Sequence, residues 1–115
     1  MIRNLDRDWR ERVVKNNLDL IILRLLRSQP RWGYEVNTAI RDQFRVYLSA
    51  GTLYPLLHSL EESGYIQGEW ESEKGRRGRR IYKITESGIS FLQSGEKATT
   101  ELAKIIQAQH DSKPE

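Results

Sequence analysis

The sequence predicts a mainly α-helical fold with a small β-hairpin, in the order of a winged helix-turn-helix followed by a long C-terminal dimerisation helix. Apolar residues recur at helical spacing up to residue 64, alternate with polar residues between 65 and 84, and return to helical spacing after 85. The chain of 115 residues is long enough for a single domain. We expect a winged helix-turn-helix core at about 13–85 and a dimerisation helix at about 86–110.

Composition narrows the class of protein. Hydrophobic residues make up 37% and charged residues 30% of the chain, as in a small domain with a large solvated surface. The formal net charge of +3 is only mildly basic, so the distribution of charge decides more than its sum. The absence of cysteine excludes disulfides and thiolate metal sites. Because the chain has neither a long apolar run nor the apolar core of a signal peptide, we expect a cytoplasmic protein without membrane association.

Three helices are expected before the central segment. A weak apolar pattern predicts a short leading helix over residues 6–14. The strongest periodicity follows at 18–26, where leucine and isoleucine recur every three or four residues, with Asn16 as the expected cap and Pro30 after the end. A tight connection at 32–34 leads into the next helix. Its expected buried residues are Val36, Ile40 and Phe44.

The rest of the chain is organised around residues 49–66. Four leucines, at 53, 56, 57 and 60, form one apolar stripe of a helix that Ser49 can cap and Gly64 can end. Pro55 predicts a bend or a later start near Gly51. The opposite face is short-chained and free of acids, so it could approach a phosphate backbone or simply be an ordinary surface. The residues of this face are Gly51, Thr52, Tyr54, Pro55, His58 and Ser59.

A hairpin follows, because the period changes to two at 65–71 and again at 80–84. We expect Trp70 and Tyr82 to face the core as a cross-strand aromatic pair. The intervening residues 72–79 are rich in glycine and charge, which predicts a long exposed tip.

The hairpin tip carries a dense run of positive charge. Five cations, separated only by glycine, repel one another, and a polyanion would neutralise them. Arginine also matches phosphate geometry and the narrow minor groove of DNA. The alternative is a solvated turn. Because the run lies on a hairpin directly after a candidate recognition helix, we favour nucleic-acid binding. The predicted contacts of the run are Lys74, Arg76, Arg77, Arg79 and Arg80.

Thr85 should cap a last helix that runs to about residue 109. Its apolar positions step by four and three residues, which gives a heptad-like seam that includes Gly95. The C-terminal part of this helix has no core of its own chain left to cover, so we expect a second copy to cover it. The expected interface residues are Trp9, Phe91, Ala98, Leu102 and Ile105.

From residue 18 to 88 the chain resembles the PadR-like family of transcriptional regulators. The resemblance rests on an ordered set of motifs: Gly-Tyr-Glu at 33–35, Gly-Thr-Leu-Tyr-Pro-Leu-Leu at 51–57, Leu-Glu at 60–61, Gly-Tyr-Ile at 64–66, Gly-Arg-Arg at 78–80, and Tyr-Lys-Ile-Thr-Glu-Ser-Gly at 82–88. It implies a homodimer that represses transcription from a palindromic operator, paired mainly through the C-terminal helix. Some members release DNA on binding a small molecule, so an effector is allowed but unidentified. The chain resembles the short subgroup, with one helix after the wing.

The resemblance also implies that Tyr54 lies at the front of the recognition helix, where its hydroxyl reaches a phosphate or a base edge. The alternative is a tyrosine packed under the wing. Together with Ser49, Thr52 and His58, Tyr54 completes the expected DNA contacts. We expect no metal, cofactor or catalytic residue, because His58 and His110 are isolated and no catalytic constellation is present. The competing function is a winged-helix module that binds protein or RNA without operator specificity.

Overall fold

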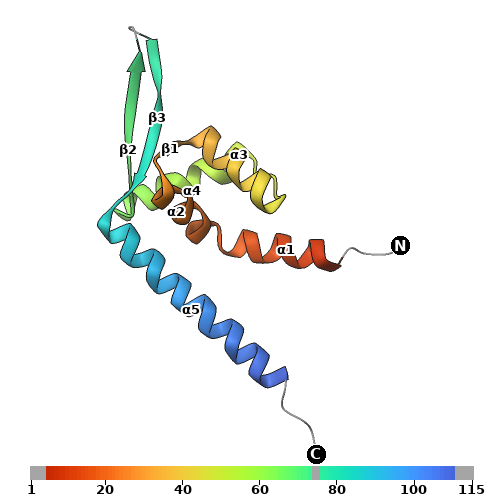
Figure 1. The fold of residues 1–115 in the computed structure, drawn as a ribbon. Helices are drawn as coiled ribbons and strands as arrows, with labels where there is room; N and C mark the ends of the chain where they lie inside the picture. The colour runs from red at the N-terminus through yellow and green to blue at the C-terminus, as the bar shows by residue number, and fades with distance from the viewer. Residues whose placement is uncertain (1–4, 74–75, 111–115) are drawn as a thin grey trace, which may run out of the picture.

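A computed structural model describes residues 5–73 and 76–110 (Figure 1). In this part of the chain five helices and three strands form an elongated molecule with extents of 72 × 39 × 20 Å. The length comes from the hairpin, which projects from one end, and from the last helix, which projects from the other (Figure 1). The elements are α1 Leu5–Asn16, α2 Leu18–Ser28, β1 Arg31–Trp32, α3 Gly33–Phe44, α4 Ala50–Glu62, β2 Ile66–Glu73, β3 Arg76–Ile84 and α5 Glu86–His110.

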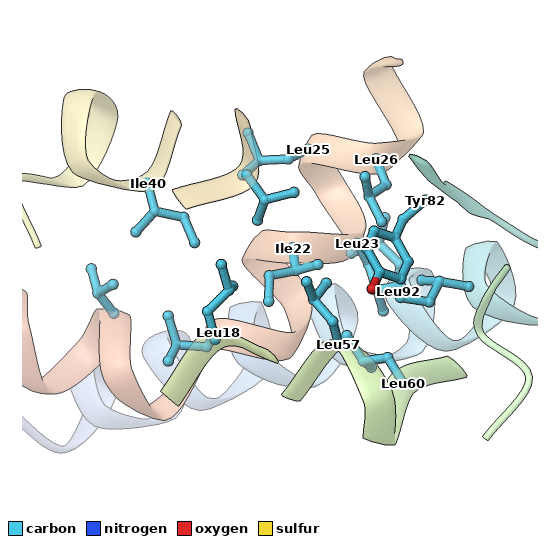
Figure 2. Close-up of a cluster of buried hydrophobic side chains, with 14 of the residues drawn as sticks. Leu18, Ile22, Leu23, Leu25, Leu26, Ile40, Leu57, Leu60, Tyr82 and Leu92 are labelled. Atoms are coloured by element: carbon cyan, nitrogen blue, oxygen red, sulfur yellow. The ribbon is translucent and has the colours of Figure 1, made fainter. Parts of the chain in front are cut away.

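The core lies where α2 is surrounded by α3, α4, β3 and the first half of α5 (Figure 2). The expected apolar stripes supply it, since α2, α3 and α4 bury the leucines, isoleucines and valine that their helical spacing places on one face. Each such side chain contributes roughly 1.5–3 kcal/mol when fully buried. Tyr82 of β3 and Leu92 of α5 complete the core from the C-terminal half of the chain.

Two of the expected helix starts differ in detail. The cap position before α2 is Asn17 rather than Asn16, because α1 continues through Asn16. The Asn17 side chain donates to the carbonyl oxygen of Val13 (2.7 Å), in the last turn of α1, and does not cap α2. Helix α4 begins at Ala50, directly after Ser49, and continues through Pro55 rather than starting later.

The boundaries around the wing follow the expected chemistry. Gly64 ends α4 with a φ of 80°, a conformation that glycine adopts without a side-chain clash. Its amide donates to the Glu61 carbonyl and the Tyr65 amide donates to the Leu60 carbonyl, both at 3.0 Å, which is a Schellman motif. Thr85 caps α5, since its hydroxyl accepts the amide of Gly88 at 3.0 Å.

The sheet has one strand more than the sequence predicted. Strand β3 is central, and it pairs antiparallel with β2 on one side and with β1 on the other. Strand β1 contains two residues, too few to show an alternating pattern. The tip is also shorter than expected, because β2 continues to Glu73 and β3 begins at Arg76. The cross-strand register places Glu71 opposite Arg79, and the ion pair between these two side chains supports strand pairing near the expected tip.

The expected aromatic pair in the core is wrong. Tyr82 is buried, with 7% of its surface exposed, but Trp70 is 59% exposed. The register explains this result, because Tyr82 lies opposite Gly68 while Trp70 lies opposite Arg80, two residues further out along the hairpin. Trp70 therefore lines the open hollow between α4 and the wing instead of entering the core.

The seam of α5 divides into two parts. Near its start, Gly95 lies against Leu20 of α2, and Phe91 stacks on Tyr65 with ring centroids 4.1 Å apart. These two expected seam residues therefore have contacts within their own chain, although 36% of the Phe91 surface remains exposed. Every residue from 97 to 109 is exposed, including Ala98, Leu102 (57%) and Ile105 (58%). Ile106, which was not among the expected interface residues, extends this exposed apolar surface.

No helix in the described residues is long and apolar enough to cross a bilayer.

Candidate nucleic-acid interface

The four predicted contacts at α4 are all exposed, but they form two groups. Ser49 and Thr52 lie together at the start of the helix, with their hydroxyl oxygens 3.3 Å apart. Tyr54 and His58 are four residues apart and lie on the side that faces the wing, in line with Glu61. The helix therefore presents small hydroxyl groups at its tip and larger hydrogen-bonding groups along the wing side.

Tyr54 is held in place by α3. A Cβ atom at Gly33 would lie 2.6 Å from the Tyr54 hydroxyl oxygen and 2.7 Å from a ring carbon, so the ring rests on the backbone of the first residue of α3. The side chain nevertheless remains 47% exposed. Packing at this position is thus against α3, and it leaves part of the ring available to a ligand.

An open hollow of about 540 Å³ separates α4 from the wing. Its walls combine donors with two carboxylates, and each carboxylate already has a basic partner. Glu61 pairs with Arg80, and Glu62 lies 3.5 Å from the His58 ring nitrogen Nε2. The residues that line the hollow are Tyr54, His58, Glu61, Glu62, Trp70, Arg80 and Tyr82.

The cation run is not uniformly available to an external anion. Arg80 is largely covered and donates to Glu61. Arg79, on the opposite face, donates to Glu71 at 3.0 Å and lies over the Trp32 ring at 4.7 Å. Both arginines therefore already have an acidic partner in the chain, but about half of the Arg79 side chain remains exposed, whereas only 30% of the Arg80 side chain does. Lys74 and the side chains of Arg76 and Arg77 lie outside the described residues.

Tyr82 forms the floor of the hollow as a neutral side chain. Burial raises the pKa of its hydroxyl above the ordinary value of 10.0, and this effect outweighs the opposite influence of the Arg80 guanidinium. Tyr82 therefore stays protonated at neutral pH and supplies no negative charge that would repel a phosphate.

Two exposed tyrosines beside α4 were missed as candidate contacts. Tyr34 is near the start of α3, and Tyr47 lies in the turn that leads into α4. Both line a shallow hollow with Thr38 and Arg41. A sequence signal existed for Tyr47, since a large aromatic residue in a short turn before a recognition helix is exposed unless it reaches back to the core. Here Val46 fills that core position instead.

No cluster of three or more metal-ligating side chains occurs among the described residues. The groups that the interface does offer are hydroxyls, one imidazole and guanidinium groups, which are hydrogen-bond donors suited to phosphate oxygens and base edges. The arrangement suits binding of an extended anionic ligand.

Comparison with known proteins gives the family. The model of the transcriptional regulator PadR-like family matches residues 22–94. A transcriptional regulator of Mycobacterium tuberculosis is 42% identical over 66 residues, which span 57% of this chain and 59% of that protein. An uncharacterized protein of Lysinibacillus sphaericus is 30% identical over 99 residues, which cover 84% of this chain and 91% of the relative.

Solved structures agree in fold over nearly the whole chain. A PadR family transcriptional regulator from Eggerthella lenta superimposes with a TM-score of 0.80 at 26% identity, covering 89% of this chain and 88% of that one. A transcriptional regulator from Clostridium thermocellum gives a TM-score of 0.76 at 27% identity, with coverage of 94% and 97%. The helix order, the hairpin and the long last helix derived above are thus those of a winged helix-turn-helix, and the chain belongs to the PadR-like family of transcriptional regulators.

Proposed function

We propose that the protein is a dimeric repressor that binds a palindromic operator sequence-specifically. The observation that carries this proposal is the juxtaposition of an exposed helix face, acid-free in its first turns, with a hairpin that projects beyond the body and ends in a cation run. In helix-turn-helix proteins the start of the second helix contacts base edges in the major groove. The repressor role follows from the resemblance to the family.

The proposed contacts divide by their chemistry. Ser49, Thr52, Tyr54 and His58 on α4 supply short hydrogen-bonding groups that suit base edges and nearby phosphates. The arginines and the lysine of the run, Lys74, Arg76, Arg77 and Arg79, suit the phosphate backbone beside the groove. Tyr34 and Tyr47 flank the same surface and extend it along the duplex.

The proposed dimer rests on the exposed half of α5. Leu102, Ile105 and Ile106 lie on one face of a helix that its own chain does not cover, and such apolar surfaces mark interaction sites. An apolar groove of about 620 Å³ lies between α1, α2 and the preceding part of α5, with Val13 in its lining, and Trp9 is exposed on α1. A second copy of α5, related by a two-fold axis, would bury the same residues on both subunits. The effector that the resemblance allows remains a prediction.

Tyr54 provides the experiment that tests operator recognition. We expect Tyr54→Phe to weaken operator binding about three- to tenfold, because it removes one hydroxyl contact and keeps the ring on Gly33. Tyr54→Ala should weaken it further and should affect the operator more than random duplex. Fluorescence anisotropy with both duplexes measures this ratio, and Tyr65→Phe, in the stacked pair with Phe91, serves as the control.

Equal reductions on operator and random DNA would instead assign Tyr54 to positioning alone. Preference for single-stranded RNA, or for an acidic protein over any duplex, would favour the alternative interaction module and would contradict the proposed function.

A further inference from the structure

A single carboxylate at the end of α4 holds both strands of the wing. The same oxygen of Glu61, Oε2, accepts the backbone amide of Gly68 on β2 at 3.0 Å and a guanidinium nitrogen of Arg80 on β3 at 2.5 Å. Glu61 lies one turn beyond His58, so the recognition helix and the hairpin are joined directly beside the predicted contact surface.

The guanidinium of Arg80 occupies a fitted position. A Cβ atom at Gly68 would lie 2.5 Å from Arg80 Nε, so the side chain crosses the strand where glycine leaves room. Its central carbon lies 5.6 Å from the Trp70 ring and 5.8 Å from the Tyr82 ring. The side chains of Arg80 and Glu61 are only 30% and 27% exposed, so water screens their attraction less than it screens the exposed pair of Lys83 and Glu69.

We propose that Glu61 and Arg80 form a positioning pair that fixes the angle between the recognition helix and the wing, and that Arg80 supports DNA binding through this pair rather than by contacting a phosphate. This inference rests on the proposed function, in which α4 and the hairpin hold the same duplex. In this proposal the other cations of the run contact DNA, and Arg80 positions the hairpin that carries them.

The geometry of the hairpin makes such a pair effective. From Gly68 to the end of β2 at Glu73 the strand extends for about 17 Å. A tilt of about 10° at the base would therefore move the tip by about 3 Å, which is enough to separate an arginine from a phosphate oxygen. Strand β2 is an edge strand of the sheet, so the contact with Glu61 restrains the side of the hairpin that β3 leaves open.

Electrostatics and positioning predict opposite signs for the removal of the Glu61 charge. Removal of an acid beside a polyanion should tighten DNA binding if charge alone matters. If Glu61 fixes the angle of the wing, removal of the Glu61 charge should weaken operator binding although the net charge of the protein becomes more positive. This opposition makes Glu61→Gln informative, and Glu69→Gln is the matched control because it removes the same charge from an exposed pair on the same hairpin.

We expect Glu61→Gln to weaken operator binding about tenfold, while Glu69→Gln leaves it unchanged or slightly tighter. Arg80→Met should weaken binding to a similar extent with an unchanged salt dependence, and the double variant should bind no more weakly than Arg80→Met alone, since both changes remove one interaction. Gly68→Ala changes no charge, but it should weaken binding because its methyl group displaces the guanidinium.

Two results would overturn the proposal. One is operator binding by Glu61→Gln that equals or exceeds that of the parent protein. The other is a change in the salt dependence of Arg80→Met, in which the slope of log affinity against log salt concentration becomes shallower by about one per subunit. That result would make Arg80 a phosphate contact.

A measurement without DNA keeps this proposal separate from the proposed function. In the free protein, NMR hydrogen exchange of the Gly68 amide should accelerate at least tenfold in Glu61→Ala and should not change in Glu69→Ala. Circular dichroism verifies that both variants are folded. Unchanged exchange in Glu61→Ala would refute the restraint of the wing by Glu61 whether or not the protein binds DNA. Failure of the parent protein to bind any duplex would refute the proposed function and leave this restraint of the wing untouched.

Discussion

Replacement of Leu102 and Ile105 together by glutamate should produce monomers that keep their helical content and no longer bind a palindromic duplex tightly. Both side chains are more than half exposed on the part of α5 that its own chain leaves uncovered. A two-fold interface would bring each introduced charge into an apolar contact with its copy, where an unpaired charge is costly. Without the dimer, one recognition helix binds alone, and we expect operator affinity to fall by about 100-fold or more because binding of the second half-site is no longer intramolecular.

Lys97→Ala combined with Lys104→Ala is the control for this experiment. These residues are seven apart on the face of α5 opposite the apolar seam, and their removal changes the net charge by the same two units. Sedimentation equilibrium reports the oligomeric state of each variant. The dimer proposal fails if the folded glutamate variant remains dimeric, or if the parent protein is already a monomer at micromolar concentration.

The second large effect is expected at the wing tip. Arg76→Ala with Arg77→Ala should weaken binding to every duplex. The slope of log affinity against log salt concentration should become shallower by about one for each phosphate that is no longer neutralised. With two arginines removed from each subunit, the change amounts to about four in a dimer. The reason is that Arg76 and Arg77 are the first two residues of β3, next to the tip of the hairpin, and backbone affinity requires cations that DNA can neutralise.

Titrations of operator and random duplex at several salt concentrations measure this slope, and the double alanine variant of Lys97 and Lys104 again controls for the removal of two charges. A slope that stays at the parent value would show that the wing does not contact the backbone.

Much of the fold could be predicted because it depends on local periodicity. The leucines of α4 and the aliphatic residues of α2 recur with a period of 3.6, and the structure buries the faces that this spacing defines. The change to a period of two located both strands of the wing. The caps at Thr85 and Gly64 were predictable for the same reason, because their hydrogen bonds join neighbouring residues.

The features that the sequence could not predict depend on partners distant in the chain. Strand β1 exists because β3 pairs with it, and its two residues carry no pattern of their own. The exposure of Trp70 depends on the register of β2 with β3, which places Trp70 opposite Arg80 rather than opposite Tyr82. The roles of Arg79 and Arg80 depend on Glu71 and Glu61, and no local spacing connects Arg80 with an acid 19 positions earlier.

The central claim, that this chain recognises a symmetric DNA sequence as a dimer, is tested most directly by selection of duplexes from a random pool followed by sequencing of those retained. We predict enrichment of an inverted repeat whose half-sites lie about one helical turn apart, so that two α4 helices meet successive major grooves. Retention without any enriched sequence, or enrichment of a single unpaired half-site, would contradict this claim.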